Sequence, residues 1–170
     1  MGLLKTFKRK ISIVENSFSK KLKVLNKKII ITGTNSGIGL ELVNILKENN
    51  NILAFVHKND ENLKKISNNN VKIIQCDFSD TNMISSHKNL IKDFNPNIVI
   101  NAAASFGSQN QNIDDLNTKD YNLLMNINFL SPLLLIQASL LNSNIEQIIN
   151  LSSDMGSINL NNSGGYYYYR

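Results

Sequence analysis

A glycine-rich segment, Thr32-Gly33-Thr34-Asn35-Ser36-Gly37-Ile38-Gly39, holds the residues of this chain whose types and spacing most clearly suggest chemistry. It lies between an apolar run that predicts a strand, residues 28–32, and a helical pattern at residues 39–48. A glycine turn at such a junction lets backbone N–H groups approach a pyrophosphate, and the helix dipole favours the negative charge. The segment therefore predicts a phosphate-binding loop.

The rest of the chain supplies the context that such a loop requires. Five apolar runs predict buried strands, at residues 28–32, 52–57, 71–76, 97–101 and 145–152. Helical patterns separate them, including a face of Met83, His87, Leu90, Ile91 and Phe94 and a long apolar helix over residues 118–141. Alternating strands and helices predict an α/β fold with a parallel sheet.

Length and charge limit the classes of function. The 170 residues correspond to one domain, and 42% hydrophobic with 18% charged residues is typical of a globular protein. The net charge of +5 is uneven: residues 1–28 hold nine of the 18 basic residues and one acid, Glu15, so the remainder carries −3. This distribution argues against nucleic-acid binding by the body of the chain.

Cysteine and histidine usage argues against thiol or metal chemistry. Cys76 is the single cysteine and ends an apolar run, so we interpret it as a buried strand thiol in a reducing, cytoplasmic location. His87 belongs to a helical face, which favours a structural role over metal ligation. The longest apolar stretch, residues 129–141, is interrupted by polar residues and is too short to span a membrane.

The spacing Gly-x-x-x-Gly-x-Gly with a preceding threonine resembles the short-chain dehydrogenase/reductase family of the classical type, and the likeness covers residues 28–170. It implies a Rossmann-type doubly wound sheet, here truncated after the fifth strand. It also implies that Asp77 with Phe78 contacts the adenine ring. The element Asn101-Ala102-Ala103 would border the cofactor, with alanine where the family has glycine.

The same resemblance implies the catalytic residues. Asn128 matches the helix asparagine of the family, Ser153 the serine that polarises the substrate oxygen, and Tyr169, before Arg170, the tyrosine that exchanges the hydroxyl proton. Hydride would pass between a nicotinamide and a carbonyl or alcohol carbon of a small-molecule substrate.

A proline in the long helix gives Asn128 a physical argument of its own. Pro132 lacks the N–H that would bond the Asn128 carbonyl, so we expect a kink there. The freed carbonyl can hold a water, as the family's proton relay requires; a kink that serves packing alone is the alternative.

Cofactor choice depends on the residues that follow the second strand. An acid there bonds the ribose hydroxyls of NAD, whereas a base accommodates the 2′-phosphate of NADP. The chain has His57-Lys58-Asn59 and no acid until Asp60, so we predict NADP(H) over NAD(H), bound by Lys58. If Lys58 is only a solvated charge, Lys58→Glu leaves the preference unchanged.

The position of the family's catalytic lysine, four residues after the tyrosine, lies beyond Arg170. Two hypotheses follow. In one, the chain is the N-terminal two-thirds of a reductase whose activity belongs to the complete gene product. In the other, it is a non-catalytic remnant that binds NADP(H).

Residues 1–27 predict a basic extension before the nucleotide-binding domain of residues 28–170. Apolar residues recur at helical spacing among its lysines, at Leu4, Phe7, Ile11, Val14, Phe18, Leu22 and Leu25. Such a helix can pack on the body or a partner, lie on an anionic membrane surface, or remain a loose tail.

Two further expectations concern partners. The helix over residues 118–141 is apolar on all sides by pattern, which hints at a homo-oligomer of the kind the family forms. Substrate determinants would lie in residues 105–115 and 154–165, and neither segment indicates a particular ligand.

Overall fold

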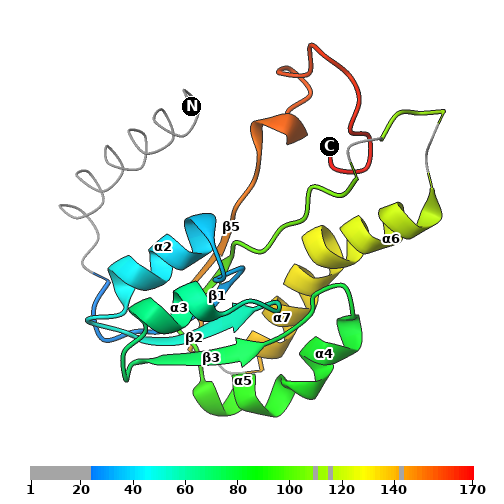
Figure 1. Cartoon of the computed structure of the whole chain (residues 1–170). Helices are drawn as coiled ribbons and strands as arrows, with labels where there is room; N and C mark the ends of the chain where they lie inside the picture. Colours follow the sequence, from blue (N-terminus) through cyan, green and yellow to red (C-terminus); the bar gives the residue numbers. More distant parts are fainter. Residues whose placement is uncertain (1–23, 109–110, 115–116, 142–143) are drawn as a thin grey trace.

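The chain folds around a five-stranded parallel sheet (Figure 1). A computed structural model describes residues 24–108, 111–114, 117–141 and 144–170. The strand order is β3-β2-β1-β4-β5, and every neighbouring pair is parallel. The strands are β1 (Lys28–Thr32), β2 (Asn51–Val56), β3 (Val71–Gln75), β4 (Ile98–Asn101) and β5 (Gln147–Asn150). The predicted α/β fold of Rossmann type is confirmed.

Two apolar layers sandwich the sheet because its central strands are apolar on both faces. Ile29 and Ile31 belong to one core cluster, and Ile30, between them, belongs to the other. All three side chains are fully buried. Continuous burial of β1, β2 and β4 is what a parallel sheet covered on both faces requires.

Helices cover both faces of the sheet (Figure 1). Val43 of α2 (Gly37–Leu46) and Leu63 of α3 (Glu61–Ile66) pack into the cluster that holds Ile29. The opposite cluster receives Ile84 of α4 (Thr81–Ser86), Ile91 of α5 (Lys88–Phe94) and Leu135 of α7 (Ser131–Ser139). Between β4 and α7 the chain forms α6 (Thr118–Met125) and the π-helical segment η1 (Asn126–Leu130).

The expected long helix over residues 118–141 is interrupted. The Ser131 N–H donates to the Asn126 carbonyl, five residues back, so the irregularity lies just before Pro132. A π-helical turn is one of the recognised causes of a kink in a helix. Within the single chain several apolar side chains of residues 118–141 are exposed: Tyr121, Leu123, Phe129, Leu130, Leu133, Leu140 and Leu141. The expectation that this helix mediates a homo-oligomer stays a prediction.

His87 divides a second predicted helix. It lies between the two helices, as the C-cap of α4 and the N-cap of α5, with φ −93° and ψ 3°. Its Nδ1 lies 2.6 Å from the Met83 carbonyl oxygen, and its ring meets the Phe55 ring edge-on at 5.9 Å. The structural role expected for this histidine is consistent with these contacts, but the single continuous helix is not.

The predicted N-terminal amphipathic helix falls almost wholly on residues outside the described part of the chain. Its last apolar position, Leu25, is described and is 43% exposed. No helix among the described residues is long and apolar enough to cross a membrane.

Candidate nucleotide-binding cleft

The glycine-rich loop connects β1 to α2 and is shaped by three glycines. Gly33 has φ +69°, and a Cβ built on it would lie 2.7 Å from the Ala103 Cα. A Cβ on Gly39 would lie 2.3 Å from the Gly33 carbonyl oxygen. Gly37 has φ +58° and nothing within 4 Å of such a Cβ. These glycines leave the backbone bare at the N-terminus of α2, where a phosphate needs close approach to main-chain N–H groups.

The side chains of this loop also fit the binding of a phosphate. Thr34 is fully buried, and its hydroxyl donates to the Phe55 carbonyl at 2.9 Å. Ser36, the residue before α2, makes no side-chain capping bond to the helix, and the first turn carries no acidic residue. The end of α2 therefore keeps its positive dipole without an internal anion to neutralise it, so the cradle fits a pyrophosphate.

Thr32 ties the loop to the segment that follows β4. Its hydroxyl oxygen accepts hydrogen bonds from the Ala102 and Ala103 N–H groups at 3.0 and 2.9 Å. Because β1 and β4 are neighbours in the sheet, their carboxyl ends meet where the order of strands reverses. Ligands of open α/β sheets bind in the crevice at that point.

A cleft of about 540 Å³ opens there. Nine of the predicted cofactor residues line it: Gly33, Asn35, Ser36, Ile38, Gly39, Asp77, Phe78, Ala102 and Ala103. Seven further residues line the cleft: His57, Cys76, Ser79, Ala104, Ser105, Leu123 and Ile127. Of these, only Ser105 was predicted to belong to the site, as part of the substrate segment 105–115. A volume in this range suits a small-molecule or cofactor site.

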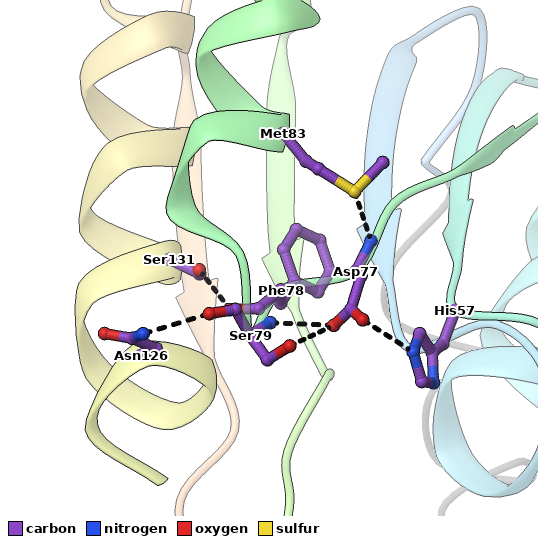
Figure 2. Close-up of polar contacts among 7 residues, drawn as sticks. All are labelled: His57, Asp77, Phe78, Ser79, Met83, Asn126 and Ser131. Atoms are coloured by element: carbon purple, nitrogen blue, oxygen red, sulfur yellow. Dashed lines mark hydrogen bonds and ion pairs between the residues drawn. The ribbon is translucent and has the colours of Figure 1, made fainter. Parts of the chain in front are cut away.

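Asp77 is the most highly connected side chain of the cleft (Figure 2). Its Oδ1 accepts from the Ser79 hydroxyl at 2.7 Å and from the Ser79 N–H at 2.9 Å, and its Oδ2 lies 3.1 Å from His57 Nε2. The Ser79 hydroxyl bond is the largest cause that lowers the pKa of the Asp77 carboxyl below its usual value, against an opposing effect of burial. Asp77 is therefore an ionised, oriented carboxylate at neutral pH.

The start of α7 and the π-helical segment hold the other side of this turn (Figure 2). The Ser131 hydroxyl donates to the Phe78 carbonyl at 2.8 Å, and the Asn126 amide donates to the Ser79 carbonyl at 2.9 Å. The Asp77 N–H contacts the Met83 sulfur at 3.3 Å. The segment after β3 is thus held by contacts with α4, with the π-helical segment η1 and with α7.

Asn128, in the π-helical segment, binds the loop after β4 with both ends of its amide. Its Oδ1 accepts from the Ser105 N–H, and its Nδ2 donates to the Ser105 carbonyl, each at 2.8 Å. The side chain is therefore engaged with the main chain of a residue that lines the cleft. Its catalytic role stays a prediction.

Tyr169 lies beside the same loop. Its ring centroid is 4.6 Å from that of Phe106, and its N–H donates to the Gln111 side-chain oxygen at 3.1 Å. Gln111 is 1% exposed, and its amide nitrogen also donates to the Phe106 and Ser108 carbonyls at 2.7 and 2.8 Å. The Gln111 side chain and the ring contact of Phe106 with Tyr169 thus join the predicted substrate loop to the C-terminal segment.

Ser153 follows β5 on the exposed surface. Its hydroxyl oxygen accepts from the Met155 N–H at 3.2 Å, and Arg170 Nη1 donates to the Met155 carbonyl at the same distance. Asn128 and Tyr169 thus contact adjacent residues of one loop, Ser105 and Phe106. Ser153 is linked to the C-terminal segment through Met155 and Arg170.

Other predicted cofactor residues are not among those that line the cleft. Asn101 is 5% exposed, and its amide donates to Asn150 Oδ1 at 2.8 Å, so it joins β4 to β5. Lys58 is exposed and does not line the cleft. Asp60, the nearest acid in sequence, is paired with Lys64 Nζ at 3.0 Å on α3.

Thiol and metal chemistry gain no support here. Cys76 is fully buried, and burial raises the pKa of its thiol to about 12. Among the described ranges, no cluster of histidine, cysteine, aspartate or glutamate side chains has the makings of a metal site.

Two residues that line the cleft, His57 and Ser79, were not predicted as site residues, although the sequence carries a signal for each. His57 ends the second predicted run, residues 52–57, and directly follows the observed strand β2, at the position where the ribose is read. Asp77-Phe78-Ser79 has the spacing of an Asx turn, in which an aspartate binds the backbone two residues on. Gln111 had no signal, since its role depends on loop residues that come together only in the folded chain.

Comparisons with known proteins agree with this geometry. A family profile described as short chain dehydrogenase matches residues 27–167. An uncharacterized oxidoreductase of Staphylococcus epidermidis is 29% identical over 142 residues, which make up 79% of this chain and 61% of that protein. The chain thus spans about three-fifths of the length of the curated relatives it matches.

Solved structures share the fold. A 4-hydroxyisoleucine dehydrogenase complexed with NADH superposes with a TM-score of 0.67 at 25% identity, over 85% of this chain and 62% of that one. A short chain dehydrogenase from Burkholderia cenocepacia in complex with NADP gives a TM-score of 0.73 at 18% identity, over 87% of this chain and 63% of that one.

Proposed function

This chain belongs to the short chain dehydrogenase family, and on that premise we propose that it binds NADP(H) in preference to NAD(H). We propose further that it forms the cofactor-binding part of an oxidoreductase acting on a carbonyl or alcohol. The observation that carries the proposal is the glycine cradle at the N-terminus of α2, tied by Thr32 to Ala102 and Ala103 across the open cleft.

The nicotinamide, when bound, supplies or accepts the hydride. In the proposed arrangement the N-terminal N–H groups of α2 hold the pyrophosphate, and Asp77 receives the adenine amino group. The absence of a carboxylate immediately after β2 supports the NADP(H) preference, because Asp60 is already paired with Lys64. Lys58 remains a candidate ligand for the 2′-phosphate.

Three side chains would serve the substrate oxygen and the wall of the cleft. We propose that the Tyr169 hydroxyl gives or takes the proton of the substrate oxygen and that the Ser153 hydroxyl donates a hydrogen bond to that oxygen. Asn128 would keep Ser105 in place at the wall of the cleft. Free tyrosine has a pKa near ~10, so proton exchange at neutral pH needs a neighbouring positive charge.

Calorimetric titration of the purified chain with NADPH and NADH tests the proposal. We expect saturable binding of both, tighter for NADPH. Gly39→Val should abolish binding, because a side chain at this position meets the Gly33 carbonyl; Gly156→Val, on an open surface turn, is the matched control. Absence of binding by a folded chain would contradict the proposal. Binding without carbonyl-dependent oxidation of NADPH would limit this chain to nucleotide binding.

A further inference from the structure

A histidine and a carboxylate face each other at the end of the cleft where β2 and β3 stop. His57 directly follows β2, lines the cleft, and has a half-exposed side chain whose Nε2 lies 3.1 Å from Asp77 Oδ2 (Figure 2). In this fold the position after the second strand reads the ribose of the adenosine. His57 is therefore better placed than Lys58, which does not line the cleft, to meet a group on that ribose.

Asp77 gives the imidazole a fixed orientation. Two hydrogen bonds from Ser79 hold one carboxylate oxygen and leave the other toward His57. The carboxylate stays ionised because the Ser79 hydroxyl lowers the pKa of Asp77. The protonated imidazole neutralises this carboxylate, whereas the neutral imidazole leaves it uncompensated.

The charges around His57 come from two segments. Lys58 and Asp60 lie on its own segment, with Asp60 paired to Lys64. The segment after β3 contributes Asp77 and Asp80, and its buried Cys76 is uncharged at neutral pH. The loop before α2, residues 33–39, carries no ionisable side chain. Histidine is the residue type in this set that ordinarily changes its charge between pH 5 and 8.

We propose that His57, oriented by Asp77, binds the 2′-phosphate of the adenosine ribose in its protonated form, so that selection of NADP(H) over NAD(H) weakens as the pH rises. The inference rests on the proposed function. Below neutral pH the imidazolium donates to the phosphate and cancels the Asp77 charge. Above it, the phosphate dianion faces a bare carboxylate, and the two repel each other.

Lys58 is the alternative ligand for the same phosphate, and the pH dependence of binding distinguishes it from His57. Lysine as a residue type carries its charge from pH 6.5 to 8.5, so a preference carried by Lys58 does not strengthen as the pH falls. The ligand's own titration has the opposite sign, because a phosphate monoester with a second pKa near ~6 loses negative charge as the pH falls. A preference that strengthens at low pH must therefore come from the protein.

The experiment compares 2′,5′-ADP with 5′-AMP, since the two differ only in the 2′-phosphate. Their dissociation constants for the full chain are measured by calorimetry at pH 6.5 and 8.5, for the wild type and for His57→Gln, Lys58→Gln and Lys65→Gln. Lys65, exposed on α3, controls for the loss of one positive charge. We expect the wild-type affinity ratio to be about fivefold higher at pH 6.5, the order of one hydrogen bond to a charged group at a half-exposed site.

His57→Gln should remove this pH dependence, and Lys65→Gln should preserve it. A second measurement needs no variant: in buffers of different ionisation enthalpy, binding of 2′,5′-ADP at pH 7.5 should take up protons, whereas binding of 5′-AMP should take up fewer. A flat ratio in the wild type, or a preference abolished only by Lys58→Gln, overturns the inference while nucleotide binding stands. Failure of 5′-AMP, 2′,5′-ADP and NADH alike to bind removes the proposed function itself.

Discussion

Replacement of Thr32 by valine tests whether one hydroxyl holds the two halves of the cleft together. Thr32 is 2% exposed, and its oxygen accepts from the Ala102 and Ala103 N–H groups. Valine has nearly the same shape but accepts no hydrogen bond, so two partly buried N–H groups lose their partner. At about 1–2 kcal/mol for each such group, we expect the free energy of unfolding to fall by about 2–4 kcal/mol.

Thr32→Ser is the matched control, because it keeps the oxygen and removes only a buried methyl, at about 1 kcal/mol. Urea denaturation followed by circular dichroism measures both variants. With a slope of about 2 kcal/mol per molar urea, typical of a small domain, Thr32→Val should lower the midpoint by about 1–2 M and Thr32→Ser by about 0.5 M.

The nucleotide affinity gives a second readout of the same change. Loosening of Ala102 and Ala103 should weaken NADPH binding to Thr32→Val more than to Thr32→Ser. The reasoning is wrong if the two variants unfold at the same urea concentration and bind NADPH equally. Loss of the Thr32 hydroxyl would then cost no more stability or affinity than loss of the Thr32 methyl group.

Four further outcomes are expected. Burial raises the pKa of the Cys76 thiol to about 12, so at pH 8 Ellman's reagent should label the folded chain about a thousandfold more slowly than the urea-unfolded chain; equal rates would contradict this burial. Because the pKa of Asp77 is lowered in the folded chain, its stabilisation is fully present above the unfolded value and is lost as the pH falls through the folded value. In urea unfolding measured at a series of pH values, Asp77→Asn should therefore lose less stability below about pH 4 than the wild type, and equal losses would contradict this reasoning. Gln111→Leu removes three side-chain hydrogen bonds and should lower the free energy of unfolding by about 2–4 kcal/mol, with faster proteolysis near Tyr169. An unchanged urea midpoint would show that Gln111 does not stabilise the contact between the loop and the C-terminal segment. If residues 1–27 lie on an anionic membrane surface, the full chain should cosediment with anionic liposomes at low salt and be released at high salt, and failure to cosediment would count against that role.

The fold could be predicted because its signals are local. Each strand is an apolar run of four to six residues, and the glycine loop stands at the first junction of strand and helix. The ends of β1 were predicted to the residue, whereas β5 is shorter than the run 145–152 that predicted it. The register of β5 with β4 ends at Asn150, opposite Asn101, which is the last residue of β4, and apolar character alone does not reveal where a neighbouring strand ends.

The errors arose where a local pattern depends on distant contacts. The apolar pattern through His87 is continuous and predicted one helix, whereas the chain breaks into α4 and α5 at this residue. The contact of the His87 ring with the Phe55 ring stabilises the break. The pairing of His57 with Asp77 requires β2 and β3 to end side by side, and only the register Val56 opposite Gln75 establishes that. The contact of Asn128 with Ser105 likewise joins positions 23 residues apart.

The three glycines of the phosphate loop differ in which substitutions each position could accept during evolution. At Gly33 and Gly39 the obstacle is main chain, so no second substitution elsewhere can act as a suppressor by making room. Gly37 meets no neighbour and is restricted by its backbone angle alone, so asparagine, which tolerates left-handed angles, is an accessible replacement there. Genetic selection for nucleotide binding should therefore recover variants at position 37 and none at positions 33 and 39.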